Sequence, residues 1–266
     1  MLDWLPENIS TFGEGVDHLF ALIYYISVAI FVLVNAVYIV FIFKYRRRRK
    51  SDRAYHYHGS NLLELTWTAL PFALFLFLAF YSDGVWREIK YDSHAPNPDY
   101  TVEVMGQTYM WHFRYPGSDG IFGHREQQYI SPTNPFGIDA ADPNGKDDMV
   151  TINRLTLPIN RNVLVRLSSM DVIHSFFLPN LRVKQDAIPG QWVNVWFNGG
   201  KTGEYEIACA ELCGSGHYLM RAELDFMPQS KFDAWMDGEN SRIAAAAAPK
   251  PSVLAADTTS AASSIR

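Results

Sequence analysis

Cysteine is scarce in this chain: its 266 residues include only Cys209 and Cys213, and both lie in one short stretch. Two cysteines allow at most one disulfide, which would suit an extracytoplasmic domain. The chain has no Cys-x-x-Cys-His motif, so it lacks the attachment signature of a c-type haem. We also find no internal repeat.

Basic residues are few outside one cluster. Between Asp83 and Glu239 acidic residues outnumber basic ones by 21 to 13, and the net formal charge of the chain is -5. The acidic excess argues against nucleic-acid binding and permits a basic protein partner. The cations are concentrated between Lys44 and Arg53, where the sequence is KYRRRRKSDR.

Charges are nearly absent from two long apolar runs, Leu19–Phe43 and Leu62–Tyr81. Each is long enough to cross a bilayer, and Pro71 in the second run predicts a kink. The basic cluster between them is typical of a cytoplasmic loop, so we expect everything after Ser82 to be extracytoplasmic. Residues 1–17 lack a basic segment and a small-residue cleavage site, so they are not an obvious signal peptide.

Glu64 lies at the edge of the second apolar run. A carboxylate there is costly unless it is hydrated or paired, which favours a role in proton or ion movement. It is equally compatible with a solvated glutamate stabilised by the helix N-terminus. Position alone leaves both interpretations open.

The segment after residue 100 is rich in β-branched and aromatic residues separated by turn residues about every ten positions, which predicts a sandwich or small barrel. Residues 116–148 are rich in Pro, Gly, Asn and Asp and predict a long surface loop. Pro228–Gly238 predicts an amphipathic helix, and the Ala/Ser-rich segment from Ser241 predicts a flexible tail. The expected strand regions are Tyr100–Tyr115, Met149–Leu157, Asn162–Ser169, Val193–Phe197, Glu204–Cys209 and His217–Leu224.

Four side chains with soft or borderline ligand atoms lie within twelve residues: Cys209, Cys213, His217 and Met220. Two thiolates, an imidazole and a thioether suit copper far better than magnesium or calcium. Zinc has little use for a thioether. A mononuclear blue-copper site needs only one cysteine, so two cysteines with a second histidine would instead support two coppers sharing the sulfurs. His174, 35 residues before Cys209, is the candidate for that histidine.

These motifs resemble subunit II of cytochrome c oxidase. The resemblance covers residues 15–238 and rests on the sequences DVIHS around His174, KQDAIPG from Lys184, and CAELCGSGHYLM from Cys209, together with the helical hairpin and its LLELTWTALP sequence. It implies an α-helical transmembrane hairpin followed by an all-β, cupredoxin-like Greek-key barrel that carries a dinuclear CuA centre.

The resemblance also implies domain boundaries and a location. The N-terminal segment 1–17 is extracytoplasmic, the anchor 18–82 contains a cytoplasmic basic loop 44–60, and residues 83–99 form a linker. The CuA domain covers 100–240, and the tail covers 241–266. The expected location is the bacterial inner membrane, with both termini and the copper domain on the periplasmic side.

The resemblance assigns the ligands as follows. Cys209 and Cys213 bridge two coppers, His174 and His217 each bind one copper, and Met220 is a weak ligand. Glu211 binds through its backbone carbonyl, which leaves its carboxylate to bind a magnesium shared with subunit I.

The resemblance further places Glu64 at the entrance of a proton path into subunit I, where haem and copper reduce oxygen to water. Tyr109 and Trp111 fall at the positions of electron entrance and relay, and Asp171 falls at a donor-docking position. The implied partners are subunits I and III, membrane lipid, and a soluble or membrane-bound cytochrome c, with no nucleic acid.

The chain departs from the family pattern near the expected donor site. Tyr109 stands where a tryptophan is usual, Arg114 stands where a glutamate is usual, and Gln191 replaces an arginine. Asn153 lies in a TIN sequence where Val-Asp-Asn is common. We therefore hypothesise that the donor docks differently or is not a highly basic cytochrome c, and that its oxidation depends weakly on salt. The alternative is that Tyr109 serves as well as tryptophan and other acids form the patch.

Other functions are less well supported. A nitric oxide reductase with a CuA subunit is the closest alternative, and Glu64 and Glu211 favour the oxidase over it. A copper-free quinol oxidase subunit conflicts with the complete ligand set. A membrane-anchored copper carrier would not need a hairpin built to pack on a partner, and nitrous oxide reductase needs a propeller domain that this sequence lacks.

Overall fold

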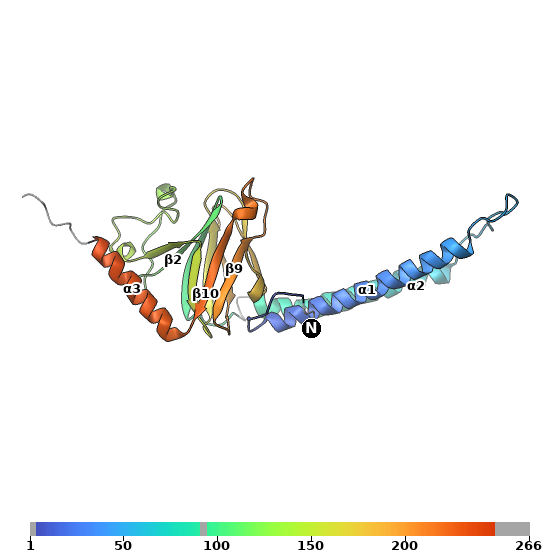
Figure 1. The fold of residues 1–266 in the computed structure, drawn as a ribbon, viewed down its shortest axis with the longest axis horizontal. Coiled ribbons are helices and arrows are strands. Elements are labelled where there is room, and N and C mark those ends of the chain that lie inside the picture. The colour runs from blue at the N-terminus through green and yellow to red at the C-terminus, as the bar shows by residue number, and fades with distance from the viewer. Residues whose placement is uncertain (1–3, 91–94, 248–266) are drawn as a thin grey trace, which may run out of the picture.

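The computed structural model describes residues 4–90 and 95–247. Two long helices, α1 (Gly13–Lys44) and α2 (Asn61–Lys90), run side by side away from a β-domain, and a C-terminal helix, α3 (Gln229–Ala247), lies on the other side of that domain (Figure 1). The predicted apolar spans are confirmed as helices. The predicted linker is wrong for residues 83–90, because α2 continues through them to the domain.

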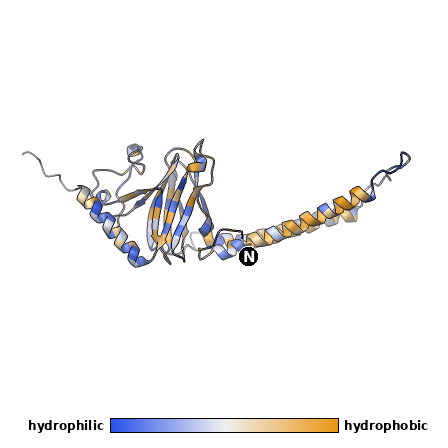
Figure 2. Cartoon of the chain, viewed as in Figure 1, coloured by the Kyte–Doolittle hydropathy of each residue, from blue (hydrophilic) through white to orange (hydrophobic). Residues whose placement is uncertain are grey.

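Both long helices have the properties of membrane spans. They are long and apolar enough to cross a bilayer, and no residue in their most apolar windows is buried within the chain. Figure 2 shows them mainly orange along their length, with polar residues at the loop that joins them and beside the domain. Pro71 lies inside α2, where a membrane helix tolerates it.

The domain is a sandwich of two five-stranded sheets. The first sheet has the order β3-β2-β1-β5-β8, and the second has the order β4-β10-β9-β6-β7. Each sheet contains one parallel pair, β1 with β5 and β4 with β10, among antiparallel neighbours. The strands are β1 Tyr100–Gln107, β2 Met110–Tyr115, β3 Met149–Ile152, β4 Arg154–Pro158, β5 Val163–Ser169, β6 His174–Leu178, β7 Val183–Ala187, β8 Val193–Phe197, β9 Gly203–Cys209 and β10 Arg221–Met227.

The core lies between the two sheets and is formed by alternate residues of facing strands, as the two-residue period of a strand requires. Val104 and Phe113 of the first sheet and Phe176 of the second are fully buried, and the two phenylalanine rings lie 6.5 Å apart between their centroids. Tyr115 closes the core beneath α3: its hydroxyl accepts from the Thr156 amide at 2.8 Å, and its ring meets Trp235 edge-on.

Several observed strands differ from the predicted ones. The expected strand Met149–Leu157 is two strands in different sheets, because the chain turns at Asn153, which has φ 54°. Strands β6 and β7 were not among the predicted strands. The predicted strand His217–Leu224 is wrong at its start, where His217–Leu219 form a 3-10 turn (η4). The predicted flexible tail is wrong for residues 241–247, which extend α3 because alanine is the strongest helix former; the rest of the tail lies outside the described residues.

Residues 116–148 form a surface segment, as predicted, and a group of buried charges lies where it meets the first sheet. The segment includes two 3-10 turns, η1 (Gln127–Tyr129) and η2 (Pro143–Lys146). Arg114 points to this side of β2 and is fully buried. It is paired with Glu103 of β1 at 2.8 Å and with Asp148 of the segment. Its guanidinium also donates to the Gly123 carbonyl at 2.6 Å.

This burial corrects one expectation. We expected Arg114 to alter the surface on which an electron donor docks, but no part of its side chain reaches the surface. The charge at position 114 serves instead to balance two buried carboxylates and to hold the segment 116–148 on the sheet. The buried cation is a structural requirement, since without it Asp148 would be buried with no cation and Glu103 would keep only Arg125 and Arg166.

Candidate metal centre

Three of the predicted ligands meet at one end of the sandwich. The ligand atoms of His174, Cys209 and Cys213 all lie within 4.8 Å of one another. The two sulfur atoms are 3.9 Å apart, so the cysteines are free thiols and not a disulfide, in which the sulfurs would be about 2 Å apart. The structure therefore supports the metal interpretation of these cysteines over the disulfide.

The remaining predicted ligands divide between the two sulfurs. His174 Nδ1 lies 3.9 Å from the Cys209 sulfur, and the Glu211 backbone oxygen lies 3.2 Å from the same atom. His217 Nδ1 lies 3.6 Å from the Cys213 sulfur, and the Met220 sulfur lies 3.8 Å from it. Each thiol thus has one imidazole and one weaker ligand beside it.

Local structure explains why these residues converge. His174 begins β6 and Cys209 ends β9, and these two strands are antiparallel neighbours. The loop after Cys209 turns back through η4, which brings His217 and Met220 to the same place. Gly106 of β1 makes room for the imidazole, because a Cβ there would lie 2.8 Å from His174 Cδ2. A glycine inside a strand is the sequence signal of such a close approach.

Asp171 fixes the orientation of His174. Its Oδ1 accepts from His174 Nε2 at 2.8 Å and from the Val172 amide at 2.7 Å. Its Oδ2 accepts from the Thr108 amide at 2.8 Å and the Thr108 hydroxyl at 2.7 Å. Partial burial would raise the pKa of Asp171, but these hydrogen bonds outweigh it and lower the pKa to about 2.

The consequence is a defined tautomer. A carboxylate that accepts from Nε2–H leaves Nδ1 of His174 unprotonated and turned toward the Cys209 sulfur, which is the state that binds a metal. Thr108 was not among the predicted site residues, although it orients the Asp171 carboxylate, which in turn orients His174. Donor docking at Asp171 stays a prediction. The structure adds a separate contact, the hydrogen bond between Asp171 and His174.

Tyr109 and Trp111 occupy different environments. Trp111 is fully buried, and its ring meets His174 at 6.0 Å and Phe176 at 5.4 Å between centroids. Tyr109 is only half buried, and its hydroxyl lies 3.3 Å from the Ser215 hydroxyl. Of the two predicted electron-transfer residues, only Tyr109 therefore reaches the surface.

The Tyr109 ring lies against the cysteine loop itself. A Cβ on Gly214 would lie 2.6 Å from the Tyr109 hydroxyl oxygen, and one on Gly216 would lie 2.5 Å from its ring. Gly214 also has φ 132°, which L residues rarely adopt. The two glycines in the cysteine loop thus let an aromatic ring contact the backbone beside Cys213. Neither glycine was among the predicted site residues.

The donor set fits copper. A metal about 2.3 Å from each of two sulfurs requires them to be no more than about 4.6 Å apart, and these are 3.9 Å apart. Without metal, burial and the neighbouring Cys209 raise the pKa of the Cys213 thiol to about 11. Binding a cation at this site therefore displaces a proton, as thiolate ligation requires.

Two predicted residues lie away from this cluster or point out of it. Glu64 is in the first turn of α2, at the far end of the helix pair from the domain, and it is exposed. Glu211 is in the cysteine loop, and its side chain is exposed while its backbone oxygen faces Cys209.

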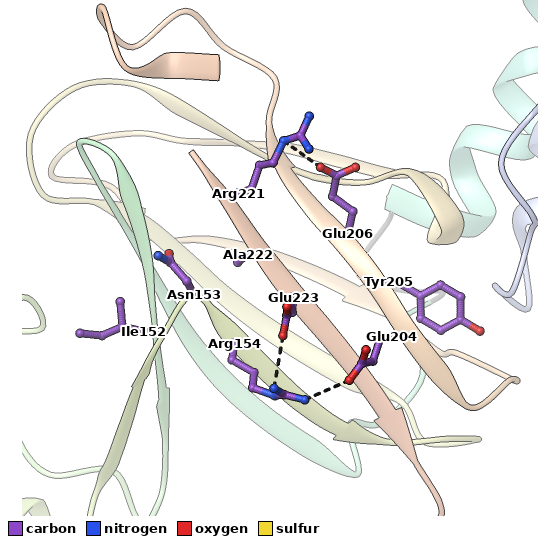
Figure 3. A pocket seen from close by; sticks show the side chains of 9 residues that line it. All are labelled: Ile152, Asn153, Arg154, Glu204, Tyr205, Glu206, Arg221, Ala222 and Glu223. Atoms are coloured by element: carbon purple, nitrogen blue, oxygen red, sulfur yellow. Dashed lines mark hydrogen bonds and ion pairs between the residues drawn. The ribbon is translucent and has the colours of Figure 1, made fainter. Parts of the chain in front are cut away.

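A depression of about 620 Å³ on the outer face of the second sheet contains none of the predicted ligands. Figure 3 shows Arg154 between Glu204 and Glu223, with Arg221 paired to Glu206 nearby. These side chains form ion pairs with one another on the exposed face of β4, β9 and β10, where carboxylates outnumber arginines. The depression is therefore a strand face covered by ion pairs. The candidate metal site lies elsewhere, at the end of the sandwich.

The fold and the site together define a membrane-anchored cupredoxin-like domain with a thiol- and imidazole-lined metal site. The family profile for cytochrome c oxidase subunit II, periplasmic domain, matches residues 100–226, and that for its transmembrane domain matches residues 4–84. The chain is 34% identical to the alternative cytochrome c oxidase subunit 2 of Bradyrhizobium diazoefficiens over 239 residues, which cover 88% of this chain and 83% of that protein. The chain belongs to the cytochrome c oxidase subunit II family.

Other relatives agree. The probable cytochrome c oxidase subunit 2 of Rickettsia bellii is 31% identical over 83% of this chain and 81% of that protein. The crystal structure of the periplasmic domain of subunit II of cytochrome oxidase from Bradyrhizobium japonicum is 30% identical and covers 56% of this chain and 99% of that one, with a TM-score of 0.42. The family match makes the protein a subunit of a haem–copper oxidase complex, anchored in the membrane with a periplasmic domain and associated with other oxidase subunits.

Proposed function

We propose that this chain receives electrons from a cytochrome c and passes them to haem in subunit I, where oxygen is reduced to water. The observation that supports this most directly is the grouping of two thiols, two imidazoles, a thioether and a backbone carbonyl around one point. His174, Cys209, Cys213, His217 and Met220 would hold two coppers of a CuA centre, with the carbonyl of Glu211 as the sixth ligand. When bound, this centre would supply the capacity to take up and release one electron.

Residues around the predicted ligands support electron transfer by orienting the ligands and excluding water. Asp171 and Thr108 hold His174 in the binding tautomer, and the strands β6 and β9 hold the ligands on a rigid frame, which limits rearrangement between redox states. Trp111 and Phe176 form a dry aromatic wall behind His174, and such a wall excludes water and influences the potential of a metal site. Tyr109 offers the route from the surface to the cysteine loop.

The surface at this end of the domain carries exposed apolar side chains beside the carboxylates of Asp171 and Glu211, which bears on the donor. The side chains Val172, Ile173 and Tyr218 are 43%, 48% and 73% exposed near Tyr109 and the ligands. An apolar docking surface gives an association rate that depends weakly on ionic strength. This supports a donor that docks by apolar contact. A steep fall of the oxidation rate with salt would refute this part of the proposal.

Further roles belong to the same proposal. The exposed carboxylate of Glu211 would bind a magnesium ion shared with subunit I. Glu64, at the opposite end of α2, would take up protons for pumping on the cytoplasmic side. This arrangement requires the basic loop 44–60 in the cytoplasm and both termini in the periplasm.

The test is the choice of substrate by the purified complex. We expect it to oxidise reduced cytochrome c with oxygen as acceptor, and the variant Cys213→Ser to lose this activity while still assembling. Oxidation of a quinol at the same rate in wild type and variant would instead indicate a quinol oxidase. Reduction of nitric oxide, with no oxygen consumption, would indicate the reductase.

A further inference from the structure

A groove lies where the helix pair meets the domain. It has a volume of about 540 Å³ and is lined by Val16 and Leu19 of α1, by residues 79–90 of α2, and by β7 and β8 of the domain. Its walls are mainly apolar. The side chains of Val183 and Val195 close it on the domain side, where both are buried.

The position of the groove along α2 matches the edge of a bilayer. Its lining begins at Ala79, within the apolar run, and ends at Lys90, about 16 Å further along the helix axis at 1.5 Å per residue. Trp86, which is 58% exposed, lies between them, and tryptophan is enriched at the level of the lipid headgroups. One end of the groove therefore faces the acyl chains and the other faces the headgroups.

The headgroup end carries positive charge. Lys90 and Lys184 both line it, and in the described residues Lys90 forms no ion pair. The Lys90 ammonium donates to the neutral Gln185 side chain at 2.7 Å and lies 5.9 Å from the centre of the Trp86 ring. Lys184 is paired with Asp186 at 3.0 Å but remains half exposed, so it keeps donors for another acceptor.

The other charges at this end are already satisfied within the chain. Arg182 makes a two-pronged ion pair with the buried Asp17 of α1, at 2.6 and 3.0 Å. Asp83 is paired with Arg87 at 2.7 Å. A ligand that enters the groove therefore meets a net positive headgroup end above an apolar slot.

We propose that this groove binds one anionic phospholipid, with its phosphate at Lys90 and Lys184 and an acyl chain between the feet of α1 and α2. The charge complementarity selects an anionic headgroup over a zwitterionic one, because each lysine near a membrane surface strengthens the binding of anionic lipid about fivefold. The apolar walls select a lipid over a free phosphate ion. The inference rests on the membrane anchor of the family and not on the proposed copper chemistry.

Native mass spectrometry of the intact oxidase complex tests this. The complex is reconstituted in vesicles of phosphatidylcholine with phosphatidylglycerol, extracted in mild detergent, and the lipids retained are counted. We expect wild type to retain phosphatidylglycerol in preference to phosphatidylcholine. Lys90→Gln and Lys184→Gln should each reduce that preference about fivefold. Lys231→Gln, on the exposed face of α3, is the matched control and should retain it.

A second kind of variant tests the apolar part of the groove without changing any charge. Ala79→Trp fills the apolar end of the groove from an exposed helix position, and it should lower retention of phosphatidylglycerol while copper content and thermal unfolding stay at wild-type values. Equal retention of both lipids by wild type would overturn the proposal. Unchanged retention in the lysine variants would also overturn it, as would a density map of the complex in which side chains of another subunit fill the groove. None of these outcomes affects the proposed electron transfer, which the copper and activity measurements test separately.

Discussion

The contact between Asp171 and His174 can be tested by mutation, because every partner of the carboxylate donates a hydrogen bond to it, including a long one of 3.5 Å from the Ser169 hydroxyl. Oδ1 faces His174 Nε2 and the Val172 amide, and Oδ2 faces the amide and hydroxyl of Thr108. Asparagine has the same shape but only one acceptor oxygen. In Asp171→Asn, the amide NH₂ must therefore face one of these pairs of donors.

Either orientation of the amide weakens the site. If the NH₂ group faces Thr108, the hydrogen bond from the Thr108 backbone amide is lost, and the Thr108 hydroxyl must rotate to become an acceptor. If it faces His174, Nε2 must become the acceptor, which moves the ring proton to Nδ1, the atom beside Cys209. Loss of the partner that orients a metal-bound histidine typically costs ten- to a hundred-fold in metal affinity, so we expect a reduction of about that size.

The assay is copper competition with a chelator on the purified complex, together with the EPR spectrum. Asp186→Asn is a matched control, because Asp186 contacts Ser175 and Lys184 and none of the predicted ligands. Thr108→Val removes only the hydroxyl donor, and its effect should be smaller than that of Asp171→Asn. Copper affinity and EPR parameters in Asp171→Asn equal to those of wild type would refute the orienting role.

Three further changes test other parts of the structure. Gly216→Ala should slow reduction by the donor without loss of copper, because the new Cβ would displace the Tyr109 ring; stopped-flow reduction measures this, and an unchanged rate would argue against Tyr109 as the route. Arg114→Met should lower the free energy of unfolding by about 3–5 kcal/mol, since Asp148 would remain buried without a cation and Glu103 would keep only Arg125 and Arg166; denaturant unfolding measures it against the exposed Arg221→Met, and equal losses in the two variants would contradict this role of Arg114. The rate of copper uptake by the metal-free protein should rise with pH, by up to about tenfold for each pH unit, as long as the pH is below the pKa of Cys213. Burial raises that pKa to about 11, and only the thiolate binds metal. An uptake rate that does not change with pH would contradict this prediction.

The ligand cluster was predictable because it is local. Cys209, Cys213, His217 and Met220 lie within twelve residues, and their chemistry alone indicates a soft metal. His174 became a candidate only through the need for a second histidine and through the family resemblance, because its proximity to Cys209 depends on the pairing of β6 with β9. The membrane helices were predictable for the same local reason, since each is a single apolar run.

Long-range contacts account for what the sequence analysis did not find. The burial of Arg114 depends on Asp148, 34 residues away, and on the surface segment between them. The composition of residues 116–148 predicts a surface loop, so it does not indicate that Asp148 is buried against the first sheet. Likewise, Thr108 contacts Asp171 across 63 residues, through the neighbouring strands β1 and β5. Nothing near either residue in the sequence indicates these pairs.

The central claim is that this chain holds two coppers that share Cys209 and Cys213. The most direct measurement is the copper content of the purified complex together with the EPR spectrum of its partly reduced form. We expect about two coppers per chain beyond those of subunit I, with hyperfine structure from one electron shared equally by both. The spectrum of a single copper, or a stable Cys209–Cys213 disulfide in the native complex, would contradict it.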